Sequence, residues 1–292
     1  MRIDSDRIIS RPTPIMNYLD SFVRMPDNLS TLYQYTSIEA LLNGIIVKNP
    51  SEGKEICLWA SNCEYMNDPD EVKTGRRFAE KIFRCSQQDF KKSLLKTEEN
   101  IREKLFITSF SSTKDCLPMW RMYGNNCYGI SLGFDVKTIL DMYKNLIYQC
   151  VYIDDKHKKD LNKLFNDVFP ADCNTQNDFK QVLEKKALSI FDGITSFITM
   201  FVYAMFLAKN PYYSYEKECR LFFLAEEKIE FRHRNNLIIP YIKNYLPKSA
   251  LKEIWIGPAN DMARVTKSLK MYLDYMGFGH VVIKKSQIPY RG

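Results

Sequence analysis

The chain has 292 residues, of which 45% are hydrophobic and 26% are charged. This ordinary globular composition can bury a substantial core in one large domain or two smaller ones. The formal net charge of +7 favours anionic partners such as nucleotides or nucleic acid, but the basic residues are scattered and form no block that would itself indicate phosphate binding.

Cysteine, histidine and hydropathy patterns exclude several classes of protein. The eight cysteines are dispersed without a Cys-x-x-Cys pair, which argues against a disulfide framework and a zinc ribbon. The three histidines lie far apart, so we expect no His-built metal site. The amino terminus lacks the apolar core of a secretory signal, and the apolar run 193–208 is shorter than the roughly 20 residues that span a membrane. We expect a cytoplasmic protein with free thiols, no membrane partner and a buried helix at 193–208.

Taken in order, the first elements are an arm, a strand and a short helix. Residues 1–30 are polar and interrupted by prolines, which predicts an N-terminal arm. Residues 32–35 alternate as in a strand. Thr36 or Ser37 can then cap a helix over 38–43 that ends at Gly44. Further strands are predicted at 45–47, 57–60, 106–113, 128–134 and 151–153.

An acidic cluster follows at Asn67-Asp-Pro-Asp-Glu71. Three acids in four residues could ligate a hard cation. We favour a helix start instead, with Asp68 as N-cap, Pro69 at the first helical position and Glu71 two residues later, because the apolar residues after it keep helical spacing.

The middle of the chain carries hydroxyl, aromatic and glycine motifs. The strand 106–113 runs into a hydroxyl-rich loop, and glycines alternate along 128–134, where they allow close approach of a backbone or a ligand. Trp120, Arg121 and Tyr123 could stack on a base and hold a phosphate. An ordinary core role for the two aromatic residues is an equal alternative.

The second half predicts an insertion, a long helix and a βαβ unit. Residues 154–178 form a polar insertion or lid, and apolar residues from 179 onward keep helical spacing. Strands at 254–256 and 280–283 flank a helix that ends at Gly277, so these strands should be parallel. We predict an α+β protein with a single domain over 31–292, in which helices surround a central mixed sheet.

The stretch Glu216-Lys-Glu-Cys-Arg220 is the strongest candidate site. In a strand, Glu216, Glu218 and Arg220 would point to one face. Such a row must be ion-paired or functional if that face is buried. A structural salt bridge or an exposed charge ladder is an equal alternative.

Six segments in order resemble the bacterial domain-of-unknown-function family 2971, which supplies almost no chemistry. They are Leu32-Tyr-Gln-Tyr-Thr-Ser37, Asn67-Asp-Pro-Asp-Glu71, Met119-Trp-Arg-Met-Tyr123, Gly129-Ile-Ser-Leu-Gly-Phe134, Tyr215-Glu-Lys-Glu-Cys-Arg220 and Ser286-Gln-Ile-Pro-Tyr-Arg291.

A looser resemblance is to ADP-ribosyltransferases that place a Ser-Thr-Ser-like strand before a Glu-x-Glu. The resemblance implies NAD as substrate, Glu218 as the carboxylate at the nicotinamide ribose, and Glu216 as its partner toward the acceptor. Thr108-Ser109 and Ser111-Ser112 would supply the hydroxyl strand. The first strand departs from the pattern, because Tyr33 and Tyr35 stand where these enzymes carry Arg or His. Arg121 or Arg220 would have to substitute.

Three functions from different classes are therefore open. The first is an ADP-ribosyltransferase-like enzyme that cleaves the nicotinamide N-glycosidic bond of NAD, with a protein or nucleic-acid acceptor and a role in bacterial defence or as a toxin. The second is a metal-dependent phosphodiester or nucleotide hydrolase that uses Asp68, Asp70, Glu71, Glu216 and Glu218. The third is a non-enzymatic sensor that binds a nucleotide or a partner. We favour the first, for which no metal is expected.

Overall fold

The computed structural model describes residues 28–66, 73, 77, 88–143, 146–153, 206–234 and 236–290. The chain divides into two compact units, which are described separately. Unit 1 comprises 1–24, 66–104 and 150–211, and unit 2 comprises 25–65, 105–149 and 212–292. Several predictions lie outside the described residues: the arm up to residue 27, the acidic cluster 67–71, the insertion 154–178 and the apolar helix up to residue 205.

Unit 1 contains a long helix and a small parallel pair of strands. Helix α4 spans Gln88–Lys104, and buried Glu98 forms an ion pair with Arg102 at 3.7 Å. Strand β6, Val151–Tyr152, pairs in parallel with β7, Ala208–Lys209. The predicted strand 151–153 is thereby confirmed, one residue shorter.

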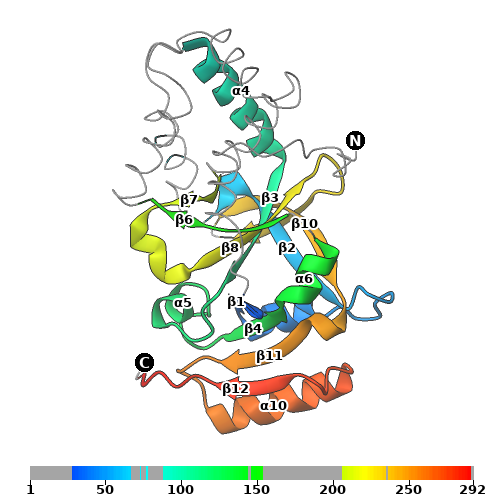
Figure 1. The fold of residues 1–292 in the computed structure, drawn as a ribbon. Helices are drawn as coiled ribbons and strands as arrows, with labels where there is room; N and C mark the ends of the chain where they lie inside the picture. The colour runs from blue at the N-terminus through cyan, green and yellow to red at the C-terminus, as the bar shows by residue number, and fades with distance from the viewer. Residues whose placement is uncertain are drawn as a thin grey trace. The chain divides into compact units, whose positions relative to one another are not determined.

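Unit 2 is built on a mixed sheet of ten strands among the residues that the structure describes (Figure 1). The strands are β1 Thr31–Thr36, β2 Ile56–Asn62, β3 Leu105–Ser111, β4 Ile130–Asp135, β5 Ile147–Gln149, β8 Glu218–Leu224, β9 Glu230–Arg234, β10 Leu237–Leu246, β11 Leu251–Ile256 and β12 Val282–Lys285. The helices are α2 Ile38–Ala40, α5 Leu117–Met122, α6 Val136–Met142 and α10 Met262–Tyr275. Shorter helical turns are the π-helical η2 Leu41–Ile45 and the 3-10 turns η3 Cys63–Tyr65, η4 Pro211–Glu216 and η5 Lys248–Ala250.

Strand β3 is the branch point of this sheet. One of its edges pairs with β8 along its whole length, and β5 pairs beyond β8. The other edge pairs with β1 at Tyr33↔Ser111 and with β2 at Ser61↔Ile107 and Asn62↔Phe106. From there the sheet continues through β1, β4, β11 and β12 on one branch and through β2, β10 and β9 on the other. The predicted α+β class with a central mixed sheet is confirmed, whereas the predicted domain bounds 31–292 stay a prediction.

The two faces of the sheet differ in chemistry because side chains alternate along each strand. One face carries the main apolar core, which also receives side chains of η2, α6 and α10; its sheet residues include Leu32, Phe110, Leu132, Phe134, Leu221 and Ile254. The other face carries tyrosines, tryptophans, serines and charged groups, including Tyr33, Ser111, Glu218 and Trp255. We call the second one the polar face.

Most predicted elements are found, with shifted ends. The cap at Ser37 is confirmed, since its side chain accepts a hydrogen bond from the Ala40 amide at 3.0 Å. The helix after it continues into the π-helical turn η2 and passes Gly44, so the predicted strand 45–47 is wrong: only Ile46 forms an isolated bridge, with Ile56.

The C-terminal βαβ unit is confirmed. Strands β11 and β12 pair in parallel, and α10 lies between them in sequence (Figure 1). Asp261 caps α10 by accepting a hydrogen bond from the Arg264 amide at 3.1 Å. The last strand begins at Val282, two residues after its predicted start.

The glycines before and within β4 allow close packing, as predicted. A Cβ atom at Gly129 would clash with the Thr36 carbonyl oxygen, which belongs to the backbone and cannot rotate away. We expect Gly129→Ala to lower the free energy of unfolding by about 1–3 kcal/mol. Gly53→Ala is the comparison, because a Cβ at Gly53 would meet no atom within 4 Å, although the backbone there has a positive φ of 77°. Chemical denaturation should show the larger loss for Gly129→Ala, and equal losses would contradict the packing argument.

Candidate functional site

One row of side chains crosses three neighbouring strands on the polar face. Tyr33 of β1 lies opposite Ser111 of β3, and Ser111 lies opposite Glu218 of β8. Paired residues of a sheet project to the same face. All three are buried, with 8%, 1% and 5% of their surfaces exposed. The first strand, the hydroxyl-rich strand and the Glu-x-Glu segment therefore meet in one place.

Glu218 is held by Arg220, two residues further along β8. The guanidinium donates from Nε to Oε1 at 3.0 Å and from Nη2 to Oε2 at 2.9 Å. Arg220 is fully buried. This two-point contact satisfies both carboxylate oxygens, and removing one partner of such a buried pair is costly.

Glu216 does not continue the row, which corrects the predicted strand face. Strand β8 begins at Glu218, and Glu216 is the last residue of the turn η4. Lys217 between them has a positive φ of 41°, so the alternation of a strand is interrupted there. Glu216 instead accepts a hydrogen bond from the Tyr123 hydroxyl at 2.8 Å. The Ser111 hydroxyl donates to the Glu216 carbonyl oxygen at 2.6 Å.

Ser109 lies one step along β3 on the same face. It is opposite Arg220, and Tyr148 of β5 lies opposite Arg220 on the other side. The Ser109 Oγ is buried and has no hydrogen-bond partner in the described part of the chain. Buried hydroxyl groups usually have a hydrogen-bond partner. The Ser109 hydroxyl would gain one if it donated a hydrogen bond to a bound ligand.

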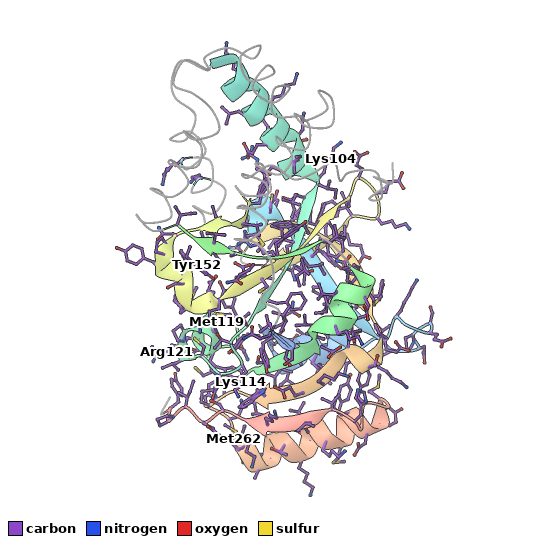
Figure 2. All side chains as sticks on the ribbon, viewed as in Figure 1. Lys104, Lys114, Met119, Arg121, Tyr152 and Met262 are labelled. Carbon is purple, nitrogen blue, oxygen red and sulfur yellow. The ribbon has the colours of Figure 1, made fainter. Side chains whose placement is uncertain are left out.

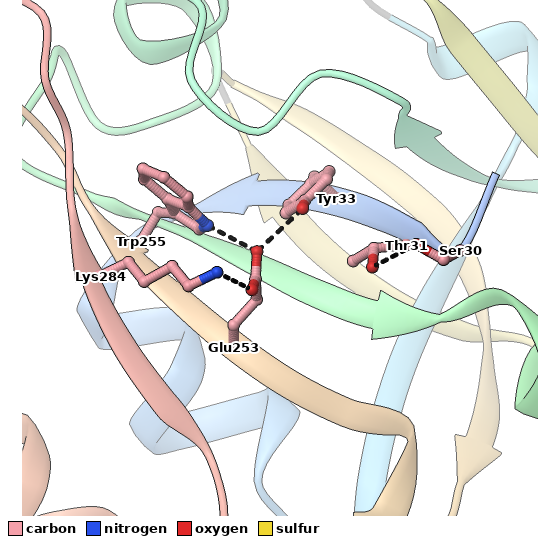
Figure 3. A network of polar contacts seen from close by, with 6 residues as sticks. All are labelled: Ser30, Thr31, Tyr33, Glu253, Trp255 and Lys284. Atoms are coloured by element: carbon pink, nitrogen blue, oxygen red, sulfur yellow. Dashed lines mark hydrogen bonds and ion pairs between the residues drawn. The ribbon is translucent and has the colours of Figure 1, made fainter. Parts of the chain in front are cut away.

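A polar network holds Tyr33 in its position on β1 (Figure 3). Glu253 of β11 accepts hydrogen bonds from the Tyr33 hydroxyl at 2.8 Å and from the Trp255 indole at 2.7 Å. Lys284 of β12 donates to the other carboxylate oxygen at 2.6 Å. Gly133 leaves room for this contact, since a Cβ there would lie 2.7 Å from Glu253 Cγ.

This network shifts two pKa values in opposite directions. Burial and the carboxylate of Glu253 raise the pKa of the Tyr33 hydroxyl, which therefore stays protonated as a donor. Burial alone would raise the pKa of Glu253, but hydrogen bonds from Lys284, Trp255 and Tyr33 lower it. Glu253 is therefore an ionised acceptor, and the sequence patterns did not single it out.

The predicted aromatic residues form a cluster beside the row. Trp120 is fully buried, packs edge-on against Tyr35 with ring centroids 4.8 Å apart, and donates to Asp115 at 2.7 Å. The Tyr35 hydroxyl donates to the Thr113 carbonyl oxygen at 2.9 Å. Asp115 also accepts hydrogen bonds from the C-terminal tail, from Ser286 Oγ at 2.7 Å and the Gln287 amide at 2.9 Å. Trp120 thus has core contacts, the alternative that the sequence left open for Trp120 and Tyr123, and Tyr35 packs with it.

Arg121 and Met119 both belong to α5 (Figure 2), where Met119 is buried and Arg121 is exposed. Its guanidinium is 5.7 Å from the centre of the Tyr290 ring. Arg121 is therefore not brought into the row with Glu218. Lys114 is exposed as well, and its Nζ lies 5.1 Å from the ring centre of Trp255.

The described residues contain no group of three or more His, Cys, Asp or Glu placed to hold a metal ion. Asp68, Asp70 and Glu71, which the hydrolase hypothesis needs, lie outside the described residues. None of the six described cysteines forms a disulfide with another described residue. No described helix is long and apolar enough to cross a membrane.

A family model matches part of the chain. Residues 119–221 match the model of a family described as "Protein of unknown function (DUF2971)". The match begins in α5 and ends in β8, so it includes three of the six segments noted above: 119–123, 129–134 and 215–220. Neither the curated proteins nor the solved structures contain a significant match to the chain. None of these comparisons supports the resemblance to ADP-ribosyltransferases.

Proposed function

We propose that unit 2 is an ADP-ribosyltransferase-like enzyme that cleaves the N-glycosidic bond between nicotinamide and ribose in NAD. The observation that carries this proposal is the row of Tyr33, Ser111 and Glu218 across β1, β3 and β8. The hydroxyl strand and the Glu-x-Glu segment are far apart in sequence, and the proposed chemistry requires them side by side.

The chemistry assigns different roles to the two acids. Departure of nicotinamide builds positive charge on the ribose, and a fixed carboxylate near the ribose stabilises that charge. Glu218 is the proposed carboxylate, with Ser109 as hydroxyl donor to the substrate, while Ser111, whose hydroxyl donates to the Glu216 carbonyl oxygen, positions the segment that carries both acids. Glu216, held by Tyr123, lies on the preceding turn and is proposed to face the acceptor. Water as acceptor yields ADP-ribose, and a protein or nucleic-acid group yields the modified macromolecule.

Arg220 of β8 is the proposed substitute for the guanidinium that this class carries on its first strand. Arg220 contacts both oxygens of Glu218 in the row, whereas Tyr33 and Tyr35 occupy the first strand. The phosphates of NAD would therefore have to compete with Glu218 for Arg220, so binding has to loosen a closed ion pair. A role in bacterial defence or as a toxin would follow from the consumption of NAD or the modification of a host molecule.

Nicotinamide release from NAD is the decisive measurement. The full chain is incubated with NAD, with and without cell lysate as a source of acceptor. We expect Glu218→Gln to reduce release by about 10²–10³-fold, as the loss of one preorganised electrostatic group does in other enzymes. Ser111→Ala should reduce release less, and Glu227→Gln, a change at an exposed acid, should leave it unchanged.

Each variant must first show a native circular dichroism spectrum and a cooperative unfolding transition. The absence of nicotinamide release in every condition would sink the proposal. Saturable NAD binding without release would instead assign the site to a nucleotide sensor.

A further inference from the structure

Arg232 of β9 lies on the polar face, on the branch of the sheet formed by β2, β10 and β9. It is opposite Ile239 of β10, and the next β10 residue on that face, Tyr241, lies opposite Ser61 of β2. Arg232 is a half-buried side chain at this end of the sheet. None of the candidate site residues discussed above belongs to this group.

Two aromatic rings fix the Arg232 guanidinium. Its carbon Cζ is 5.2 Å from the ring centre of Trp59 and 5.7 Å from that of Tyr241. The two rings pack against each other with centroids 4.9 Å apart. Nη2 donates to Ser61 Oγ at 2.7 Å, whereas Nε is buried and has no hydrogen-bond partner among the described residues. Cation–π contacts orient a guanidinium but do not use the N–H groups that lie in its plane.

No carboxylate in the described part of the chain forms an ion pair with Arg232. The nearest acid in sequence on that face is Glu230. It forms an ion pair with Lys243 at 2.8 Å and accepts a hydrogen bond from the Tyr241 hydroxyl at 2.8 Å. Arg234, two residues along β9, adds a second positive charge to the same face. Burial and this neighbouring charge lower the pKa of Arg232, but the guanidinium stays charged at neutral pH.

A desolvated guanidinium with a like charge beside it and no anion costs stability unless a ligand supplies the anion. We propose that Arg232 and Arg234 form a binding site for a phosphoryl group, with Trp59, Tyr241 and Ser61 holding the guanidinium plane. A phosphoryl group fits because it offers several oxygens to the planar donor fork and carries enough charge to neutralise two arginines. This site does not depend on the NAD chemistry proposed for Glu218.

Isothermal titration of the full chain tests the site, with inorganic phosphate and ADP as separate probes at ionic strength matched with chloride. We expect Arg232→Gln to weaken binding at least tenfold, because the in-plane donors are lost. Arg232→Lys should also weaken it, since an ammonium group cannot present the fork. Arg264→Gln, at an exposed arginine of α10, should change nothing.

The two probes separate the sources of the phosphoryl group. Binding of inorganic phosphate through Arg232 assigns a free phosphate, and binding of ADP alone through Arg232 assigns a nucleotide. If Arg232→Gln does not fold, Arg232→Met is tested in its place, because Met keeps the apolar part of the arginine side chain. No binding of either probe, or equal affinities in Arg232→Gln and Arg264→Gln, would overturn the proposal.

Discussion

Replacing Arg220 with Met lowers the free energy of unfolding by about 3–5 kcal/mol, because it leaves the carboxylate of Glu218 buried without its guanidinium. Glu218 is 5% exposed and Arg220 is fully buried, so water cannot replace the two lost hydrogen bonds without opening the sheet. Urea denaturation followed by circular dichroism measures the loss. A change of this size is a large share of the stability of an ordinary domain.

The double variant Glu218→Leu/Arg220→Met distinguishes pairing from packing. Removing both charges replaces the ion pair with apolar side chains, which is often neutral or stabilising. We therefore expect the double variant to be more stable than Arg220→Met alone. If the double variant were less stable than Arg220→Met alone, the two positions would contribute by packing and not by pairing.

The same ion pair limits what the candidate site can do. The positive charge of Arg220 offsets that of the Glu218 carboxylate, so Glu218 stabilises charge on a substrate less well while both its oxygens accept from Arg220. A catalytic role requires a second arrangement in which Arg220 turns to the ligand, and NAD could supply that alternative partner through its phosphates. Arg220→Lys, which keeps the charge but loses the two-point contact, should therefore alter nicotinamide release more than it alters folding.

Local sequence patterns predicted which residues of a single strand share the polar face, but not which strands lie side by side. Glu218 and Arg220 share a face because strand side chains alternate, and this could be read from the sequence. The meeting of Tyr33, Ser111 and Glu218 could not, since it depends on register between strands that are far apart in the chain. Register is set by the whole sheet and not by a local sequence pattern.

Two other features, the interruption at Lys217 and the role of Glu253, were not predicted from the sequence, for local reasons. The positive φ at Lys217 ends the alternation before β8, and no glycine or asparagine marks that position. Glu253 lies on β11, one residue before the predicted strand 254–256. Its alternation with Trp255 was the available signal, because a charged residue on the same strand face as a buried Trp needs partners.

The last prediction concerns Trp120, for which the sequence allowed either base stacking or a core role. We expect Trp120→Ala to lower the free energy of unfolding by about 3–5 kcal/mol, the usual cost of emptying a buried aromatic site. The side chain is fully buried, packs edge-on against Tyr35 and donates to Asp115. Trp120→Phe should cost less, since an aromatic ring is kept and only the hydrogen bond and part of the volume are lost.

Arg121→Ala is the matched control, because Arg121 is the next residue of α5 and is exposed. Its stability should lie within about 0.5 kcal/mol of the wild type. Denaturation of the three variants side by side decides between the two roles of Trp120. If Trp120→Ala were as stable as Arg121→Ala and lost NAD binding, Trp120 would be a binding residue. A large loss of stability would mean that the aromatic cluster serves to hold α5 against β1, so that Tyr123 can reach Glu216.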